Sequence, residues 1–132
     1  MFVRFVVLER HPDSHCAMGV FQALYALRDR DALRDYEADS FAEAARWFNA
    51  HLCAPRRLSR ATRAGANHDA VCWFRHTARH HIARVRDLTA LLEHRGVPTR
   101  MLVTRRPGYV VYRDAHQVAA VPFRYAAARR IN

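Results

Sequence analysis

The C-terminal third of the chain contains three short runs of β-forming residues joined by two tight connections. The runs span residues 101–104, 109–113 and 116–121. The connections, at 105–108 and 114–115, contain the proline, glycine and aspartate residues that are typical of turns. Strands joined by turns this short pair in antiparallel order. The two tight connections therefore predict an antiparallel meander of these three strands.

The rest of the chain supplies two further strands and three helices. Apolar runs predict strands at residues 2–8 and 70–74, and helical periodicity predicts helices at about 16–28, 40–54 and 75–95. A capping box formed by Ser40 and Glu43 marks the start of the second helix, and Gly96 follows the end of the third. The order β-α-α-β-α-β-β-β predicts an α+β fold, partly ferredoxin-like, with the helices packed on one face of a mainly antiparallel sheet.

The helix expected at 75–95 has the clearest apolar face. Its residues fall within one arc of about 120° when they are placed 100° apart: Ala78, His81, Ile82, Val85, Leu88, Thr89 and Leu92. Arg75, Arg79 and Arg86 fall together on the opposite, exposed side. We therefore expect His81 to be a hydrogen-bonded histidine in the core or at its boundary, and not a catalytic residue.

Strict alternation in the run 109–113 predicts a strand that is bulky on both faces. Val110 and Tyr112 point one way in this scheme, and Tyr109 and Val111 point the other way. A strand with two apolar faces favours homodimerisation through the sheet.

Length and composition predict one soluble cytoplasmic domain over residues 1–132. The chain has 132 residues, of which 51% are apolar, enough to form a core without disulfides or metals. No apolar run approaches the length of a membrane span. The three cysteines, Cys16, Cys53 and Cys72, form no CxxC pair, which argues against a disulfide scaffold or a closed zinc cage.

The basic residues are all arginines and are unevenly distributed. Residues 1–55 hold 6 arginines and 8 acidic residues, whereas residues 56–132 hold 16 arginines and 4 acidic residues. GC-rich codons explain a preference for arginine over lysine, but they do not explain the excess of bases over acids. Such an asymmetry bears on binding partners.

This excess predicts an anion-binding surface in the C-terminal half. Nine arginines are candidate anion-binding residues, and the first four of them lie in a basic loop at about 55–69. The nine are Arg56, Arg57, Arg60, Arg63, Arg75, Arg79, Arg86, Arg105 and Arg106. The candidate stacking residues for a nucleic acid are Trp73, Tyr109 and Tyr112. The sequence contains no RRM, KH or helix-turn-helix motif.

The sequence supports a catalytic site less strongly than it supports an anion-binding surface. His76 and His80 are four residues apart on an expected helix, but no third metal ligand follows by spacing, so no metal and no cofactor is predicted. His116 follows Asp114 in a turn, where a carboxylate can orient a histidine base. Cys72 is expected to be a small buried hydrophobe. Cys16, near an expected helix start, is a weak candidate for a reactive thiol.

Several segments resemble a family of small uncharacterised bacterial proteins. These segments are FVRFVVLE, FQALYALRD, WFN, CWFR and PGYVVYRDAHQVAAVPF. The resemblance covers nearly the whole chain and implies an intact cytoplasmic single-domain protein. It carries over no activity and no catalytic residue.

The sequence therefore favours a non-enzymatic binding protein whose arginine-rich half engages RNA, DNA or an acidic protein. Two alternatives stay open. One is an immunity or antitoxin protein that neutralises a cognate toxin. The other is a metal-independent ribonuclease or phosphate-ester enzyme that uses His76, His80 or His116, with arginine stabilising charge.

Overall fold

The computed structural model describes residues 1–10, 17–53 and 70–123. The chain divides into two compact units. The described residues of the strand unit are 1–4, 70–79 and 103–123, and those of the helix unit are 5–10, 17–53 and 80–102. The expected basic loop at 55–69 and Cys16 lie outside the described residues.

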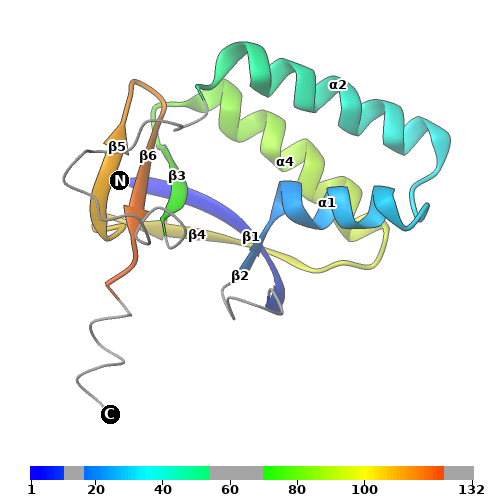
Figure 1. The fold of residues 1–132 in the computed structure, drawn as a ribbon, viewed down its shortest axis with the longest axis horizontal. Helices are drawn as coiled ribbons and strands as arrows, with labels where there is room; N and C mark the ends of the chain where they lie inside the picture. The colour runs from blue at the N-terminus through cyan, green and yellow to red at the C-terminus, as the bar shows by residue number, and fades with distance from the viewer. Residues whose placement is uncertain (11–16, 54–69, 124–132) are drawn as a thin grey trace. The chain divides into compact units, whose positions relative to one another are not determined.

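The elements confirm the predicted α+β class (Figure 1). They are β1 (Phe2–Arg10), β2 (Ala17–Gly19), α1 (Val20–Asp29), α2 (Asp35–His51), β3 (Val71–Arg75), α4 (Arg79–His94), β4 (Thr99–Thr104), β5 (Tyr109–Arg113) and β6 (Gln117–Val121). This is the predicted order of elements with one addition, the three-residue strand β2, at a position where the first helix was expected to have begun. Residues 17–19 pair with β1, so α1 begins at Val20 instead of near residue 16.

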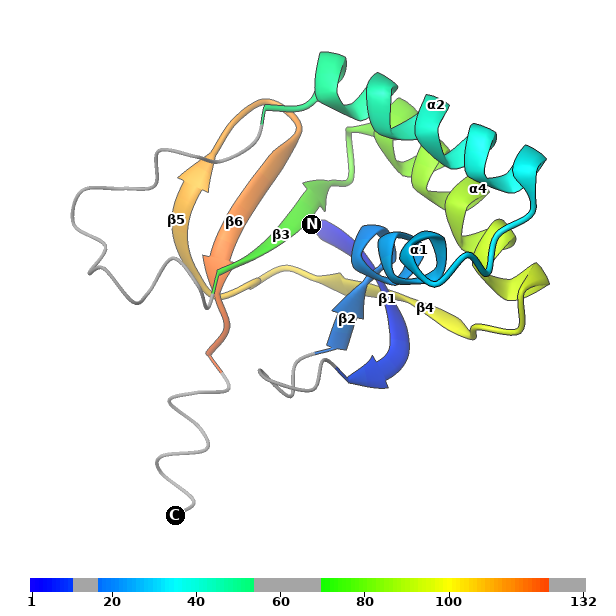
Figure 2. The same cartoon turned by 45° about the vertical axis from the view of Figure 1, so that its right-hand side comes forward.

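The strands pair in the order β2-β1-β3-β6-β5, and β4 also pairs with β1. The pairings of β1 with β2, β1 with β3, β3 with β6 and β5 with β6 are antiparallel. Within the strand unit, β3, β6 and β5 lie side by side (Figure 2). The meander predicted from the two short connections is therefore only partly present, because β5 pairs with β6 but β4 pairs with β1.

The helix unit contains a tightly packed apolar core. Leu24 of α1, Phe41 of α2, Leu92 of α4 and Val7 of β1 are all at most 1% exposed. Val85 and Leu88 of α4 are also buried, as its periodicity predicts. His81 is buried as predicted, and its Nε2 donates a hydrogen bond to the main-chain oxygen of His51 at 2.8 Å.

Helix α4 begins at Arg79, four residues later than predicted. Strand β3 continues through Arg75, whose N–H donates to the main-chain oxygen of His116 at 2.8 Å. A turn at His76 and Thr77 then precedes the helix. The predicted stripe of Arg75, Arg79 and Arg86 on one helix is therefore wrong, because pairing with a distant strand holds Arg75 in extended conformation.

Helix α2 begins at Asp35, five residues earlier than predicted, and Ser40 lies inside it. Glu37, rather than Glu43, closes the N-terminus: its carboxylate accepts the N–H of Arg34 at 2.8 Å. Glu37 is buried, and its Oε1 also accepts a hydrogen bond from Arg95 Nη1 at 3.0 Å. This ion pair fixes the start of α2 to the residue that follows α4.

A β-bulge in β5 changes which side chains share a face. Val110 pairs with Ala120 and Tyr112 pairs with Ala119, so Val111 has no partner on β6. Tyr112 therefore lies on the same face as Tyr109 and not, as alternation predicted, on the face of Val110. Bulky apolar residues still occupy both faces, with Val110 on one and Tyr109 and Tyr112 on the other, and homodimerisation stays a prediction.

Candidate anion-binding surface

The two units differ sharply in charge. The described residues of the helix unit hold nine arginines and nine acidic residues, so their formal charges cancel. Those of the strand unit hold six arginines and one acidic residue, Asp114. The six are Arg4, Arg75, Arg79, Arg105, Arg106 and Arg113. The excess of positive charge predicted for the C-terminal half therefore falls, within the described ranges, on one compact unit.

Asp114 uses its carboxylate to close the turn between β5 and β6. Its Oδ1 accepts the N–H groups of His116 at 2.8 Å and Gln117 at 3.0 Å. Its Oδ2 accepts the Tyr112 hydroxyl at 2.8 Å and Gln117 Nε2 at 3.2 Å. Four hydrogen bonds occupy this carboxylate, which leaves it poorly placed to neutralise an arginine.

The hydrogen bonds also determine the ionisation of Asp114. Desolvation by the surrounding protein acts to raise the pKa of Asp114. The hydrogen bonds from His116, Tyr112 and Gln117 act in the opposite direction and outweigh it, so the pKa of Asp114 is lowered. The carboxylate is negative at neutral pH and accepts all four bonds in that form.

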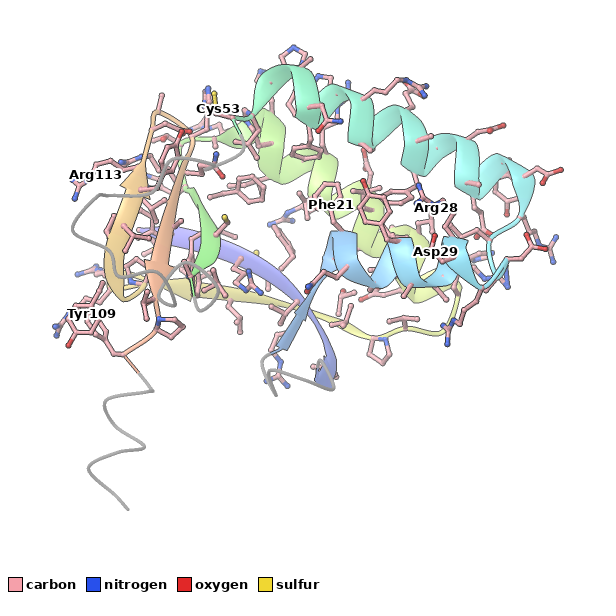
Figure 3. The ribbon with its side chains drawn as sticks, viewed as in Figure 1. Phe21, Arg28, Asp29, Cys53, Tyr109 and Arg113 are labelled. Carbon is pink, nitrogen blue, oxygen red and sulfur yellow. The ribbon has the colours of Figure 1, made fainter. Side chains whose placement is uncertain are left out.

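Four of the six arginines of the strand unit lie at two opposite ends of its strands rather than in one patch. Arg75 ends β3 and Arg113 ends β5, next to the turn at Asp114. Arg105 and Arg106 lie in the connection that enters β5 at Tyr109. Tyr109 and Arg113 mark these opposite ends (Figure 3), which are roughly 13 Å apart at 3.3 Å per residue. Convergence into a single patch is not observed among the described arginines.

Arg79, Arg105, Arg106 and Arg113 have exposed side chains. None of the four forms an ion pair with a residue that the structure describes. Arg75 has a structural role instead. It is half-buried, its Nε donates to the main-chain oxygen of Asp114 at 2.7 Å, and its guanidinium lies over the Phe2 ring at 5.9 Å.

The end near Tyr109 combines arginines with aromatic rings. The guanidinium of Arg106 lies over the Phe123 ring, 5.2 Å from its centroid. The rings of Phe123 and Tyr109 meet edge to face at 4.7 Å and 80°. Phe123 is half-buried, whereas Tyr109 is 58% exposed. We call Arg105, Arg106, Tyr109 and Phe123 the turn cluster.

Gly108 fixes the turn cluster to the end of β6. Its φ is +140°, a conformation that side chains disfavour, and a Cβ there would lie 2.1 Å from the main-chain oxygen of Val121. Thr104 closes the other side of the turn, because its Oγ1 accepts the N–H of Arg106 at 3.1 Å. The approach of this turn to Val121 brings Arg106 and Tyr109 next to Phe123.

The three predicted stacking residues do not share a face. Trp73 pairs with Val118, whereas Tyr109 and Tyr112 pair with Val121 and Ala119. Since neighbouring residues of β6 alternate between faces, Trp73 lies on the opposite face. The indole N–H of Trp73 is buried and has no hydrogen-bond partner among the residues that the structure describes. Only Tyr109 of the three has an exposed ring.

The other predicted site residues are dispersed. Arg86 belongs to the helix unit, where its Nη2 lies 3.6 Å from the sulfur of Met101. Arg56, Arg57, Arg60 and Arg63 lie outside the described residues.

The candidate catalytic histidines occupy both units. His76, in the strand unit, has its Nδ1 3.2 Å from the main-chain oxygen of Met1. His80 is exposed in the first turn of α4, in the helix unit. Asp114 binds the main-chain N–H of His116, so the expectation that this carboxylate orients the imidazole is replaced by a turn-closing role.

Cys72 is not the buried hydrophobe that its apolar surroundings predicted, because it is exposed on β3. Its thiol nevertheless has protein atoms around it, and the resulting desolvation raises the pKa of Cys72. A thiol with a raised pKa is protonated at neutral pH and is a poor nucleophile. Within the described ranges, no three His, Cys, Asp or Glu side chains are grouped so that they could hold a metal ion.

Sequence reasoning missed two residues of this surface, Phe123 and Arg113. Phe123 follows Pro122, which indicated only the end of the last strand. Its contact with Tyr109 depends on the register of β5 against β6, which the sequence alone does not reveal. Arg113 was assigned only to a strand, although it adjoins the turn residue Asp114.

No protein-family model matches the chain, and neither a curated protein nor a solved structure matches it. The resemblance to small uncharacterised bacterial proteins stays a prediction. In the part of the chain that the structure describes, no helix is long and apolar enough to cross a membrane.

Proposed function

We propose that the protein is a non-enzymatic binding protein whose strand unit engages a polyanion. The observation that carries this proposal is the balance of six arginines against one aspartate in the described strand unit. The carboxylate of that aspartate is already occupied by four hydrogen bonds. Four exposed guanidinium groups therefore face solvent without an acidic partner among the described residues of this unit.

Guanidinium groups suit phosphate and sulfate because their planar N–H groups pair with two oxygens at once. Two clusters of positive charge separated by roughly 13 Å fit an extended anion better than a small one. A polymer can contact both strand ends and release bound counterions at each contact. This favours a chain-like partner over an isolated phosphate.

The salt dependence of binding tests the proposal. The wild-type protein is titrated into fluorescein-labelled oligo(dT) and labelled polyphosphate at a series of NaCl concentrations. The logarithm of the association constant for oligo(dT) should fall linearly with the logarithm of salt concentration, with a slope of about −0.7 per phosphate contacted. Absent binding at low salt, or binding that is indifferent to salt, would contradict the proposal.

Charge-matched variants locate the surface. Arg113→Gln and Arg105→Gln each remove one exposed charge from the strand unit, and each should reduce the salt slope by about one contact. Arg30→Gln is the control, since Arg30 is exposed in the helix unit between Asp29 and Asp31. An equal loss of affinity in all three variants would mean that binding follows net charge and not this surface.

A histidine-dependent ribonuclease is the second candidate. The hydrogen bond from the Arg75 N–H to the His116 oxygen brings the segment before His76 alongside His116, beside two arginines. Such a site could combine proton transfer with charge stabilisation. Cleavage of single-stranded RNA that is lost in His116→Ala, with the fold retained, would replace the binding proposal. RNA that stays intact after long incubation would exclude this candidate.

A further inference from the structure

The turn cluster has features that a purely electrostatic surface does not need. Tyr109 is 58% exposed on β5, the terminal strand of the described sheet path. Its ring makes an edge-to-face contact with Phe123, with the ring centroids 4.7 Å apart. The Tyr109 ring offers a flat, electron-rich surface, and Arg106, which lies over Phe123 next to it, supplies positive charge. Arg105 adjoins Arg106 in the same turn.

The guanidinium of Arg106 lies over the Phe123 ring, 5.2 Å from its centroid. The main-chain N–H of Arg106 donates to Thr104 Oγ1, which fixes the backbone from which this side chain extends. A cation that lies over an aromatic ring keeps its N–H groups available in the plane of the guanidinium. Arg106 can therefore bind a phosphate while it stays on Phe123, next to Tyr109.

From this arrangement we propose that the polyanion is single-stranded nucleic acid and that one unpaired base stacks on Tyr109 while Arg106 and Arg105 bind the adjoining phosphates. This inference rests on the proposed function and specifies its ligand. Nucleic-acid single strands combine exposed planar bases with regularly spaced phosphates, which are the two groups that the turn cluster complements.

Other polyanions match fewer of these features. A duplex keeps its bases stacked against one another, so none is available to Tyr109 without unpairing. Polyphosphate and sulfated polysaccharides carry charge without aromatic rings. An acidic protein presents carboxylates, which engage arginine without a stacking surface. Single-stranded RNA or DNA is the ligand class that uses both parts of the cluster.

The test compares matched protein variants. Tyr109→Ala removes the ring, Tyr109→Phe retains it, and Tyr36→Ala is the control because Tyr36 is 60% exposed in the helix unit. Dissociation constants are measured for oligo(dT), for an oligonucleotide of the same length that carries only abasic sites, for a duplex and for polyphosphate, all at one salt concentration. Thermal unfolding of each variant checks that it folds.

Tyr109→Ala should weaken oligo(dT) binding about tenfold, the effect of losing one stacked base. Its affinity for the abasic oligonucleotide and for polyphosphate should not change, and neither should its salt slope. Tyr109→Phe should bind oligo(dT) nearly as tightly as the wild type, and Tyr36→Ala should bind it equally tightly. The wild type should bind the duplex more weakly than the single strand.

The outcomes separate the inference from the proposed function. Polyphosphate binding that depends on Arg113, together with equal affinity for oligo(dT) and its abasic counterpart, would overturn the stacked base and leave polyanion binding standing. Tighter binding of the duplex would overturn the single-stranded ligand in the same way. Failure to bind any of the four ligands would overturn both.

Discussion

Asp114 was expected to orient the imidazole of His116, but its carboxylate instead closes the turn between β5 and β6. The sequence places it two residues before His116, which predicts a carboxylate–histidine pair. In the structure its two oxygens accept hydrogen bonds from two main-chain N–H groups, a tyrosine hydroxyl and the side chain of Gln117. Gln117 is 2% exposed, so its amide relies on partners inside the protein. The turn residues thus form a partly buried polar network.

Replacing Asp114 with alanine should destabilise the protein by about 2–3 kcal/mol at neutral pH, because charged hydrogen bonds are lost and the Gln117 amide is left short of a partner. Chemical denaturation at a series of pH values measures this difference. Asp87→Ala is the control, since Asp87 is exposed on α4, and its effect should stay within about 0.5 kcal/mol.

The pH dependence has a definite sign. Folding lowers the pKa of Asp114, so the ionised carboxylate stabilises the folded state at pH values above its unfolded pKa. This contribution is lost as the pH falls through the lower pKa of the folded state. The difference between wild type and Asp114→Ala should therefore shrink below about pH 4. A difference that grows on acidification would contradict this network.

At the scale of elements, local sequence patterns predicted whether a segment is a helix or a strand better than they predicted its first residue. The apolar positions of α4 are correct because they follow from helical spacing alone: His81, Val85, Leu88 and Leu92 are buried. Its first residue is wrong because Arg75 belongs to β3, where it pairs with Phe2 of β1 and donates its N–H to the main-chain oxygen of His116. The periodicity of a segment does not reveal which distant strand it pairs with.

The same limit applies to the candidate site. The charged half of the chain and the turn that contains Arg105 and Arg106 follow from composition and turn chemistry, whereas the sequence did not show which of the three candidate stacking rings is exposed. Which face Tyr112 occupies depends on the bulge at Val111, and the packing of Phe123 on Tyr109 depends on register. These features arise from how β5 meets β6.

The turn before β5 gives a prediction at this scale. Gly108→Ala would place a methyl group 2.1 Å from the Val121 oxygen, so the turn has to move away from β6 at a cost of about 1–3 kcal/mol. Gly96 is the matched control. Its φ is +82°, but a Cβ there meets nothing within 4 Å, so Gly96→Ala should cost only about 1 kcal/mol of backbone strain.

Thermal unfolding measures the stability of both variants, and oligo(dT) binding reports the position of the cluster. Gly108→Ala should weaken binding, since it displaces Arg106 and Tyr109, whereas Gly96→Ala should leave binding unchanged. Equal stability of the two variants would show that the turn does not need to approach Val121.

At the scale of the whole molecule, charge is segregated. The sequence predicted an excess of arginine in residues 56–132, and the described strand unit carries six arginines to one aspartate while the described helix unit is balanced. Like charges held on one unit repel one another and lower its stability. A surface kept in this state is consistent with selection for an anionic partner at the expense of stability.

Added NaCl should therefore raise the thermal midpoint of the protein when no polyanion is present, because salt screens this repulsion. The double variant Arg79→Gln with Arg113→Gln should show a smaller rise and an equal or higher midpoint at low salt. Arg30→Gln, from the balanced unit, should respond to salt as the wild type does. Differential scanning fluorimetry provides the measurement, and a midpoint that falls with NaCl would contradict the prediction.

The unpartnered Val111 has a consequence for how this strand tolerates changes in length. Loss of that single codon would leave Val110 opposite Ala120 and Tyr112 opposite Ala119, now as consecutive rungs of a regular ladder. Tyr109 and Tyr112 would stay on the same face of the sheet as before. Omission of a residue elsewhere in β5 would instead shift a run of side chains through the sheet. Homologous chains can thus differ in length at this position and still present the same aromatic ring.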